Sequence, residues 1–87
     1  MNRYTVSWTP SARKRLAEMW LDNVESRQQI SDSSDQIELA LAGRPRALGR
    51  EISSDVRFVV LPPLAILFRI IEDDRQVRVI HVQFWDD

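Results

Sequence analysis

Three strand patterns occupy the last third of the chain, and the connections between them are very short. The patterns cover residues 56–61, 64–71 and 76–85, and they are separated by Pro62-Pro63 and then by the polar residues 72–75. Strands joined so closely pair antiparallel, because a parallel pair needs a connection of about a dozen residues or more. This part of the sequence therefore predicts a three-stranded antiparallel meander.

An earlier strand and a helix are predicted at the start of the chain. Residues 4–8 alternate between apolar and polar side chains, which is typical of a strand with one buried face. Thr9 and Pro10 follow and favour a helix start, since Thr9 suits the N-cap and Pro10 the first helical position. Apolar residues then recur at helical spacing, and we expect this helix to end near residues 22–23.

A second helix is expected from about residue 26 to residue 42. Its apolar side chains form one stripe, and Gly43 and Pro45 are residues that end helices. Residues 44–50 follow as a charged loop rich in turn-forming residues. The two helices together predict an α-hairpin between the first strand and the meander.

The order of one strand, two helices and three strands predicts an α+β fold with two layers. The first strand must join the sheet of the meander to bury its apolar face, and the α-hairpin then covers one side of that sheet. With 87 residues, the chain is expected to be one small domain over residues 1–87. Such a domain buries only about 60–65% of the surface of its unfolded chain, so a bound partner would add to its stability.

The composition excludes several classes of site. The chain has no cysteine, and therefore no disulfide, cysteine nucleophile or cysteine-based metal site. It has only two glycines and no metal-ligand spacing of histidine and carboxylate residues, so we expect no phosphate-binding loop, metal or cofactor. No apolar run is long enough to span a membrane and no signal peptide opens the chain, so we expect a cytoplasmic protein with no membrane partner.

The last hairpin of the meander is expected to bring two arginines together. A turn at residues 72–75 places Ile71 opposite Gln76, and Arg69 then lies close to Arg78 on one face of the sheet. The opposite face of this hairpin is wholly apolar and should meet the helices. Two like charges so close together cost stability unless an anion or an acidic group lies between them.

The face that bears these two arginines is expected to carry Val82, and also Arg57 if the neighbouring strand is oriented the same way. Three guanidinium groups would then converge on a surface that no helix covers. This arrangement favours an anion site, for nucleic-acid phosphate or for acidic side chains of a protein partner. The net charge of -1 gives no overall basic field, so such a site would be local. The alternative is a solvated face whose arginines pair with Glu51, Glu72 or Asp73.

His81, Phe84 and Trp85 are the other candidate functional residues. His81 is the only histidine, and histidine is the side chain best suited to proton transfer near neutral pH. A single histidine in a strand is also commonly a structural residue. Phe84 and Trp85 end the last strand, where they would anchor a protein partner, stack on a nucleic-acid base or pack against the first helix.

The order of elements and several short motifs resemble the RelE/ParE toxin superfamily, in particular its ParE-like and plasmid-stabilisation members. The resemblance covers nearly the whole chain. It rests on the opening strand with its helix-starting proline, on the proline and glycine after the second helix, and on three strand motifs, at residues 4–10, 41–49, 56–57, 66–70 and 77–82. It implies the toxin component of a type II toxin–antitoxin system, which inhibits growth until a cognate antitoxin binds and neutralises it.

The resemblance also implies two kinds of cellular target. ParE-like members poison DNA gyrase, whereas RelE-like members cut messenger RNA on the ribosome with a cluster of basic, tyrosine or histidine side chains. Two positions depart from that cluster. Ala65 stands where an arginine is expected, and Gln83 stands where the terminal histidine is expected, with His81 offset by about two residues. Enzymatic activity is therefore left open.

Three functional hypotheses follow from the residues and the resemblance together. In the first, the chain is a toxin that binds an antitoxin and a target such as gyrase, with Arg57, Arg69 and Arg78 orienting acidic groups. In the second it is an mRNA endonuclease, in which the same arginines stabilise phosphate charge and His81 acts as acid or base. In the third it is a non-toxic homologue that serves as a protein-interaction module. A buried His81 would exclude the second hypothesis.

Overall fold

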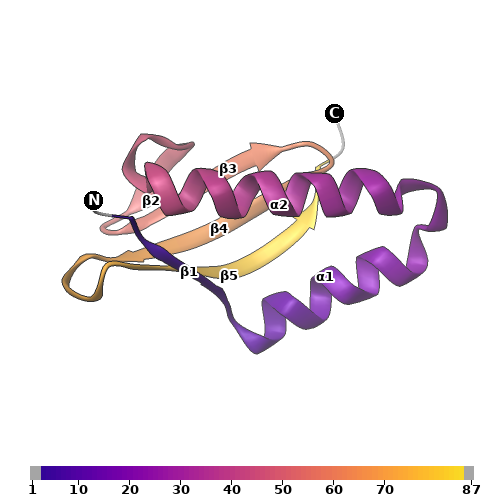
Figure 1. Cartoon of the computed structure of the whole chain (residues 1–87), viewed down its shortest axis with the longest axis horizontal. Helices are drawn as coiled ribbons and strands as arrows, with labels where there is room; N and C mark the ends of the chain where they lie inside the picture. The colour runs from indigo at the N-terminus through magenta and orange to yellow at the C-terminus, as the bar shows by residue number, and fades with distance from the viewer. Residues whose placement is uncertain (1–2, 86–87) are drawn as a thin grey trace.

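The protein, seen here as a computed structural model that describes residues 3–85, has a five-stranded sheet with two helices packed on one face (Figure 1). This is the two-layer α+β arrangement expected from the sequence. Short 3₁₀ turns lie at Val24–Ser26, Pro45–Ala47 and Glu72–Asp74. In chain order the main elements are β1 (Thr5–Trp8), α1 (Pro10–Asp22), α2 (Arg27–Gly43), β2 (Arg50–Ser53), β3 (Val56–Leu61), β4 (Leu64–Ile71) and β5 (Gln76–Phe84).

The strands lie in the order β1-β5-β4-β3-β2. The pairs from β2 to β5 are antiparallel, whereas β1 lies parallel to β5, with Thr5 opposite Gln76 and Trp8 opposite Val79. The first strand therefore joins the sheet of the meander, as expected. The meander itself is larger than the predicted three strands, because β2 adds a fourth strand beyond β3.

β2 is the strand that the sequence pattern did not predict. All four of its side chains are exposed, so the segment lacks the apolar alternation by which a half-buried strand is detected. Its pairing with β3 also changes register between Glu51 and Ser53. β3 and β4 match their predicted ranges, while β5 ends at Phe84, one residue before the predicted end.

Side chains at both ends of α1 satisfy backbone groups that the helix itself leaves unpaired. Thr9 is the N-cap, and its hydroxyl accepts a hydrogen bond from the backbone N–H of Ala12 at 3.2 Å. At the other end, Asn23 and Arg27 each donate a side-chain hydrogen bond of 2.8 Å to a carbonyl oxygen of the last turn. These bonds complete the helix ends and confirm its predicted start.

The hydrophobic core lies between the sheet and the two helices. Ser33 is a buried polar residue within it, and its hydroxyl donates a hydrogen bond to the backbone carbonyl of Leu61, which ties α2 to β3. Burying one large apolar side chain stabilises the fold by roughly 1.5–3 kcal/mol, so these residues hold the two layers together. The buried apolar cluster comprises Trp8, Ala12, Met19, Ile30, Ile37, Leu41, Val59, Leu64, Ile66, Phe68, Ile70, Val77, Val79 and Val82.

A register shift in β5 corrects one prediction about the faces of the sheet. Phe68 pairs with Val79, but the preceding residue of β4 pairs with His81, so Ile80 is an extra residue in β5. Such a bulge exchanges the two faces for every residue beyond it. Val82 therefore points into the core and is fully buried, and its predicted place beside the two arginines was wrong.

Gly49 is a glycine position that the fold requires. Its φ is +61°, and a Cβ atom built there would lie 1.9 Å from the carbonyl oxygen of Phe58. Gly43 differs, because it ends α2 and an added Cβ would have no atom within 4 Å. Substitutions at the two glycines therefore test whether the close approach of Gly49 to the backbone of β3 requires a residue without a side chain.

We expect Gly49→Ala to destabilise the protein by more than about 2 kcal/mol, since it combines a left-handed backbone with a clash. Gly43→Ala should raise the stability by up to about 1 kcal/mol, because alanine favours a helix. Chemical denaturation of both variants and of the wild type measures the two effects. Equal stabilities for the two variants would contradict this account of the loop before β2.

Candidate functional site: the open face of the sheet

We call the face of the sheet that points away from the helices the open face. Residues that pair across neighbouring strands share a face, so the register identifies its members. Arg69 lies directly opposite Arg78, and Leu67 lies opposite both His81 and Phe58. The open face comprises Thr5, Ser7, Arg50, Ser53, Val56, Phe58, Val60, Ala65, Leu67, Arg69, Ile71, Gln76, Arg78, His81 and Gln83.

Positive charge on the open face is not balanced by carboxylates of its strands. Arg69 and Arg78 are both exposed, and within residues 3–85 neither forms an ion pair. Arg50 on β2 adds a third exposed arginine on the same face, opposite Phe58. None of the strand residues that make up this face is Asp or Glu. Asp55, Glu72 and Asp73 of the adjoining turns line a pocket with Arg69, but within residues 3–85 no ion pair joins them to it. The face therefore still presents its guanidinium groups to an anionic ligand or partner.

Arg57 does not lie on the open face, contrary to one sequence expectation. It pairs with Phe68 and therefore points to the helix side of the sheet. Its Nε donates to the carbonyl oxygen of Leu48 at 2.9 Å, and its guanidinium lies 3.9 Å from the Glu51 carboxylate. The side chain is only 15% exposed. Arg57 thus holds the loop before β2, and the expected convergence of Arg57 with the two hairpin arginines was wrong.

His81 is exposed on the open face. Its Nε2 lies 3.2 Å from Oε1 of Gln83, within hydrogen-bonding distance. Leu67, its partner across the sheet, is two residues from Arg69, and such neighbours on one face of a strand lie about 7 Å apart. His81 and the arginine pair therefore face the same side of the sheet, and the Phe68–Val79 pair, whose side chains face the helices, lies between them along the strands.

Phe84 and Trp85 point in different directions. Phe84 pairs with Leu64 on the helix side of the sheet and packs, half-buried, against the core. Trp85 is 39% exposed, and its ring centroid lies 6.2 Å from that of Phe58 on the open face. The aromatic pair adds apolar surface at the end of β5. Sequence reasoning named Trp85 but missed Phe58 and Arg50, whose orientations depend on β2 and β3.

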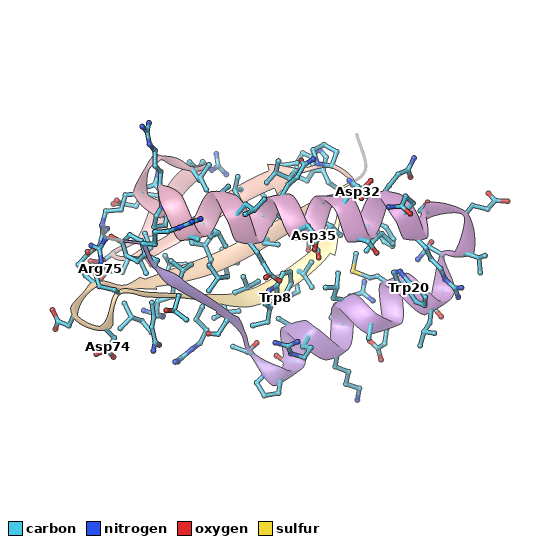
Figure 2. All side chains as sticks on the ribbon, in the orientation of Figure 1. Trp8, Trp20, Asp32, Asp35, Asp74 and Arg75 are labelled. Atoms are coloured by element: carbon cyan, nitrogen blue, oxygen red, sulfur yellow. The ribbon has the colours of Figure 1, made fainter. Side chains whose placement is uncertain are left out.

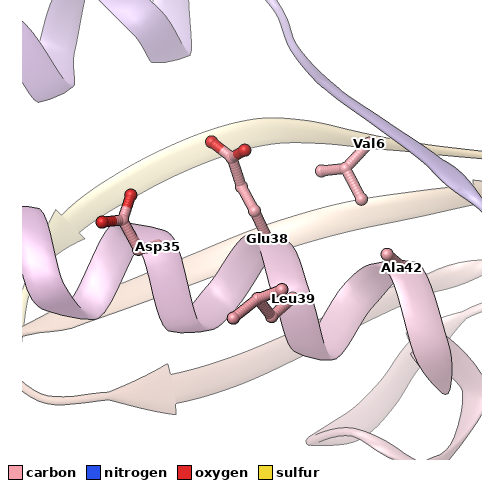
Figure 3. Close-up of a pocket in the computed structure, with 5 residues that line it drawn as sticks. All are labelled: Val6, Asp35, Glu38, Leu39 and Ala42. Atoms are coloured by element: carbon pink, nitrogen blue, oxygen red, sulfur yellow. The ribbon is translucent and has the colours of Figure 1, made fainter.

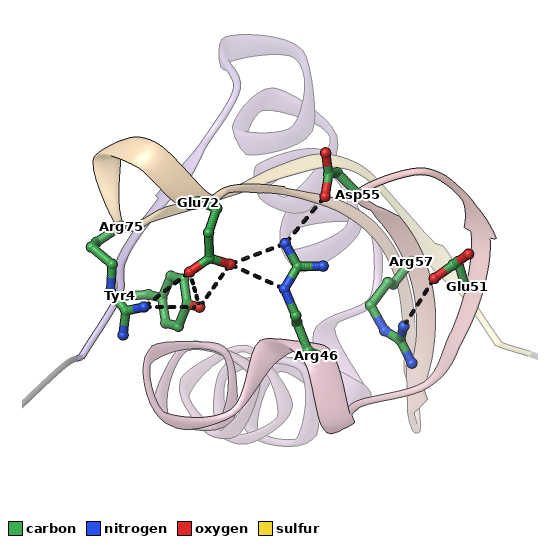
Figure 4. A network of polar contacts seen from close by, with 7 residues as sticks. All are labelled: Tyr4, Arg46, Glu51, Asp55, Arg57, Glu72 and Arg75. Atoms are coloured by element: carbon green, nitrogen blue, oxygen red, sulfur yellow. Dashed lines mark hydrogen bonds and ion pairs between the residues drawn. The ribbon is translucent and has the colours of Figure 1, made fainter.

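A network of polar contacts joins the turns at one end of the sheet (Figure 4). The Glu72 carboxylate accepts hydrogen bonds from the Tyr4 hydroxyl at 2.8 Å and from Arg75 at 2.9 Å, and it pairs with Arg46 at 3.0 Å. Arg46 also contacts Asp55 at 3.1 Å. The hydrogen bond from Tyr4, followed by that from Arg46, lowers the pKa of Glu72, and the same bond raises the pKa of Tyr4.

An apolar groove of about 400 Å³ lies between α1 and α2. Trp20, which Figure 2 labels on α1, is one of its lining residues. Leu16 and Ile30 also line the groove, and Leu21 at its rim is 60% exposed. The Arg27 guanidinium lies 4.1 Å from the centroid of the Trp20 ring, in a cation–π contact. The groove is a second surface on which a partner could bury apolar area.

Within residues 3–85, no group of three or more His, Asp and Glu side chains is placed to hold a metal ion. Neither of the two helices is long and apolar enough to cross a membrane.

We expect Glu72→Gln to be less stable than the wild type at neutral pH, because it weakens the contacts of Tyr4, Arg46 and Arg75. The folded-state pKa of Glu72 lies below the ordinary 4.5, so its carboxylate contributes fully above that value. The contribution is lost as the pH falls through the lowered folded-state pKa, and the two proteins should then converge. Urea denaturation across this pH range measures the difference. Glu18→Gln, on the exposed side of α1, is the control and should show no such convergence.

We expect the double variant Arg69→Ala/Arg78→Ala to be at least as stable as the wild type in buffer without phosphate. Opposed like charges cost about 0.2–1 kcal/mol, and the variant removes them. Adding inorganic phosphate at constant ionic strength should raise the melting temperature of the wild type more than that of the variant. Arg15→Ala/Arg44→Ala, which removes two exposed arginines elsewhere, should respond to phosphate like the wild type. An equal phosphate response in all three proteins would argue against an anion site.

The whole fold has counterparts among solved structures. No protein-family model matches the sequence, and no curated protein matches it in a sequence search. The chain is similar to a chain of the chromosomal ParDE toxin–antitoxin system from P. aeruginosa, with a TM-score of 0.76 at 16% identity, covering 99% of this chain and 100% of the other.

Two further structures show the same likeness. For the toxin–antitoxin complex RelBE2 from Mycobacterium tuberculosis the TM-score is 0.77 at 20% identity, over 100% of this chain and 97% of the other. For the isolated E. coli RelE toxin it is 0.64 at 17% identity, over 97% and 86% of the two chains. The likeness extends over nearly every residue, and the chain therefore has the fold of the RelE/ParE toxins.

Proposed function

We propose that this chain is the toxin component of a type II toxin–antitoxin system, acting in the cytoplasm and neutralised by a cognate antitoxin. The observation that carries the proposal is the pair Arg69 and Arg78, opposed on the open face without ion-pair partners within residues 3–85. A folded protein that keeps two like charges directly opposite each other on a sheet gains nothing in stability from them. Their presence is explained if an anionic group of a partner or target occupies the site.

The open face is suited to a target that presents acidic or phosphate groups beside an apolar patch. The planar guanidinium forks of Arg69 and Arg78 can each bind a carboxylate or phosphate in bidentate fashion. Phe58 and Trp85 provide aromatic surface on the same side of the sheet. A protein target such as DNA gyrase is our first assignment, because inhibition by binding requires only complementary charge and apolar surface, which the arginine pair and the two aromatic rings offer.

Antitoxin binding is supported by the apolar surface on the helices. Trp20 and Leu21 are exposed beside the α1–α2 groove, and covering them would remove apolar area from water. An 87-residue domain has limited stability of its own, so a partner that binds the folded state stabilises it by mass action. The antitoxin and the target would therefore engage different faces, or an extended antitoxin would cover both.

A second candidate function is a RelE-type mRNA endonuclease, and the exposure of His81 favours it. Only the Phe68–Val79 pair separates His81 from Arg69 and Arg78 along the strands, so a phosphate held by the arginines would be near an imidazole able to move a proton. The tyrosine and the lysine, which could also transfer a proton, do not lie beside the arginine pair. Tyr4, the only tyrosine, is bound to Glu72, and Lys14, the only lysine, lies on α1. Catalysis would then depend on His81.

We expect induction of the wild-type chain to arrest growth of a bacterial host, and the double variant Arg69→Ala/Arg78→Ala to leave growth unaffected. The variant removes the anion-binding groups while the core stays intact. Colony counts and growth curves measure the effect, with soluble, folded protein verified in each culture. Arg15→Ala/Arg44→Ala, the control with the same change of net charge, should arrest growth like the wild type.

Assays on purified components distinguish inhibition of gyrase from cleavage of mRNA. Inhibition of DNA supercoiling by gyrase, unchanged in His81→Ala, would support the first assignment. Cleavage of ribosome-bound mRNA, lost in His81→Ala, would support the second. Normal growth with soluble, folded wild-type protein would refute toxicity in that host, and the chain would then be a non-toxic interaction module with the same fold.

A further inference from the structure

The sheet has two edge strands, and they differ in how they are protected. β2 carries charged side chains and a register shift, which are features that discourage pairing with another chain. β1, at the other edge, has neither a charged residue nor an irregular register over Thr5–Trp8. β1 is therefore the edge at which a further strand can pair.

The backbone of β1 shows which groups are available for such pairing. Thr5 donates its N–H to Arg75, just before β5, at 2.9 Å, and Thr9, just after β1, donates to Val79 at 2.9 Å. Because alternate residues of a strand bond to the same neighbour, Val6 and Trp8 direct their N–H and C=O groups away from β5. Of these two, Val6 lies within the strand, whereas Trp8 ends it. The backbone groups of Val6 point to the outer side of β1, where residues 3–85 contain no further strand.

A groove of about 560 Å³ runs beside this edge, between β1 and α2 (Figure 3). Val6, Leu39 and Ala42 form its apolar part, and Leu39 is 67% exposed. Asp35 and Glu38, one helical turn apart on α2, place two carboxylates along the same groove. The groove thus has an apolar end and an acidic end.

Further contacts define the two ends of the groove. At the apolar end, Tyr4 donates its backbone N–H to the carbonyl of Ala42 at 2.9 Å, which joins β1 to α2 there. At the acidic end, the Glu38 carboxylate accepts a hydrogen bond from the indole Nε1 of Trp8 at 3.0 Å. This bond holds Glu38 over the outer end of β1. Asp35 forms no ion pair with the described residues and is exposed.

We infer that β1 and this groove bind an extended segment of a protein partner, with an apolar side chain and a basic side chain two positions apart. The segment would add a strand to the sheet through the outward backbone groups of Val6. A residue opposite Val6 would point toward Leu39, and the residue two positions along, opposite Trp8, would point toward Glu38 and Asp35. The inference does not depend on what the open face binds.

The charge of the groove decides between classes of occupant. Two carboxylates repel phosphate groups, so nucleic acid is disfavoured at this edge, whereas lysine or arginine is attracted. The apolar residues beside them favour an aliphatic side chain over a second charge. An extended peptide with an aliphatic side chain and a basic side chain two positions apart could contact both ends of the groove. Its backbone would at the same time form hydrogen bonds with β1.

The probe for the test is the peptide acetyl-Thr-Val-Thr-Arg-Thr-Val-Thr-amide, and its control is the same peptide with glutamate in place of arginine. Isotope-labelled full-length protein, made by cell-free synthesis, is titrated with each peptide and followed by amide chemical shifts. We expect the arginine peptide to shift the amides of Val6 and of residues 35–42 and to slow hydrogen exchange at Val6. The glutamate peptide should leave them unchanged.

The matched variants test the acidic end. Asp35→Asn/Glu38→Gln removes both charges, while the glutamine side chain can still accept the hydrogen bond from Trp8, so the fold should be retained. Exposed ion pairs are individually weak, so we expect a loss of about three- to tenfold in affinity for the arginine peptide. Asp32→Asn, elsewhere on the exposed surface of α2, should bind like the wild type.

Absence of shifts at Val6 with millimolar arginine peptide would overturn the inference. So would equal binding of the glutamate peptide, unchanged affinity in Asp35→Asn/Glu38→Gln, or shifts confined to the open face or to the groove between α1 and α2. None of these outcomes bears on the growth test, which depends on Arg69 and Arg78.

Discussion

The parallel pairing of β1 with β5 is the constraint on which the rest of the structure depends. It places the first strand of the chain beside the last one, with Val6 opposite Val77. The chain must then cross from the β1 edge to β2 at the far edge, and the α-hairpin makes that crossing over a single face of the sheet. One face is covered by both helices and the other stays open. The same arrangement therefore produces the core, the open face and an edge at β1 that no further strand covers within residues 3–85.

The bulge at Ile80 determines which chemistry the open face carries. Without the extra residue, the alternation of β5 would direct His81 toward the helices and Val82 toward solvent. With it, Val82 completes the core and His81 shares a face with Arg69 and Arg78. A single inserted residue thus places the one histidine and the arginine pair on the same surface. Bulges frequently re-aim side chains next to functional sites in this way.

The sequence was informative where burial imposes a period on the side chains. Both helices and strands β3 to β5 were predicted within one or two residues, because each has one face in the core. β2 was missed because all its side chains are solvated. The bulge at Ile80 was missed because nothing in the residue types of segment 77–82 marks which residue is extra.

Arg57 shows a different limit of sequence reasoning. Arg57 was predicted as a third member of the arginine cluster because it is an arginine in the strand next to that of Arg69. Its face depends on the turn at residues 62–63, where Leu61 pairs with Leu64 and Arg57 consequently pairs with Phe68. The two-residue connection fixes which residues of β3 and β4 pair, and it thereby determines the face on which Arg57 lies. Arg50, in the unpredicted β2, occupies the open face instead.

Net charge conceals a separation of charge over the surface of this protein. The chain is nearly neutral at -1, yet the strand residues of the open face include three arginines and no carboxylate. The groove beside β1 carries Asp35 and Glu38 with no arginine or lysine in its lining. Ligands of opposite charge are therefore directed to different surfaces. A partner held at β1 would leave the arginine pair exposed, so occupancy of one surface need not block the other.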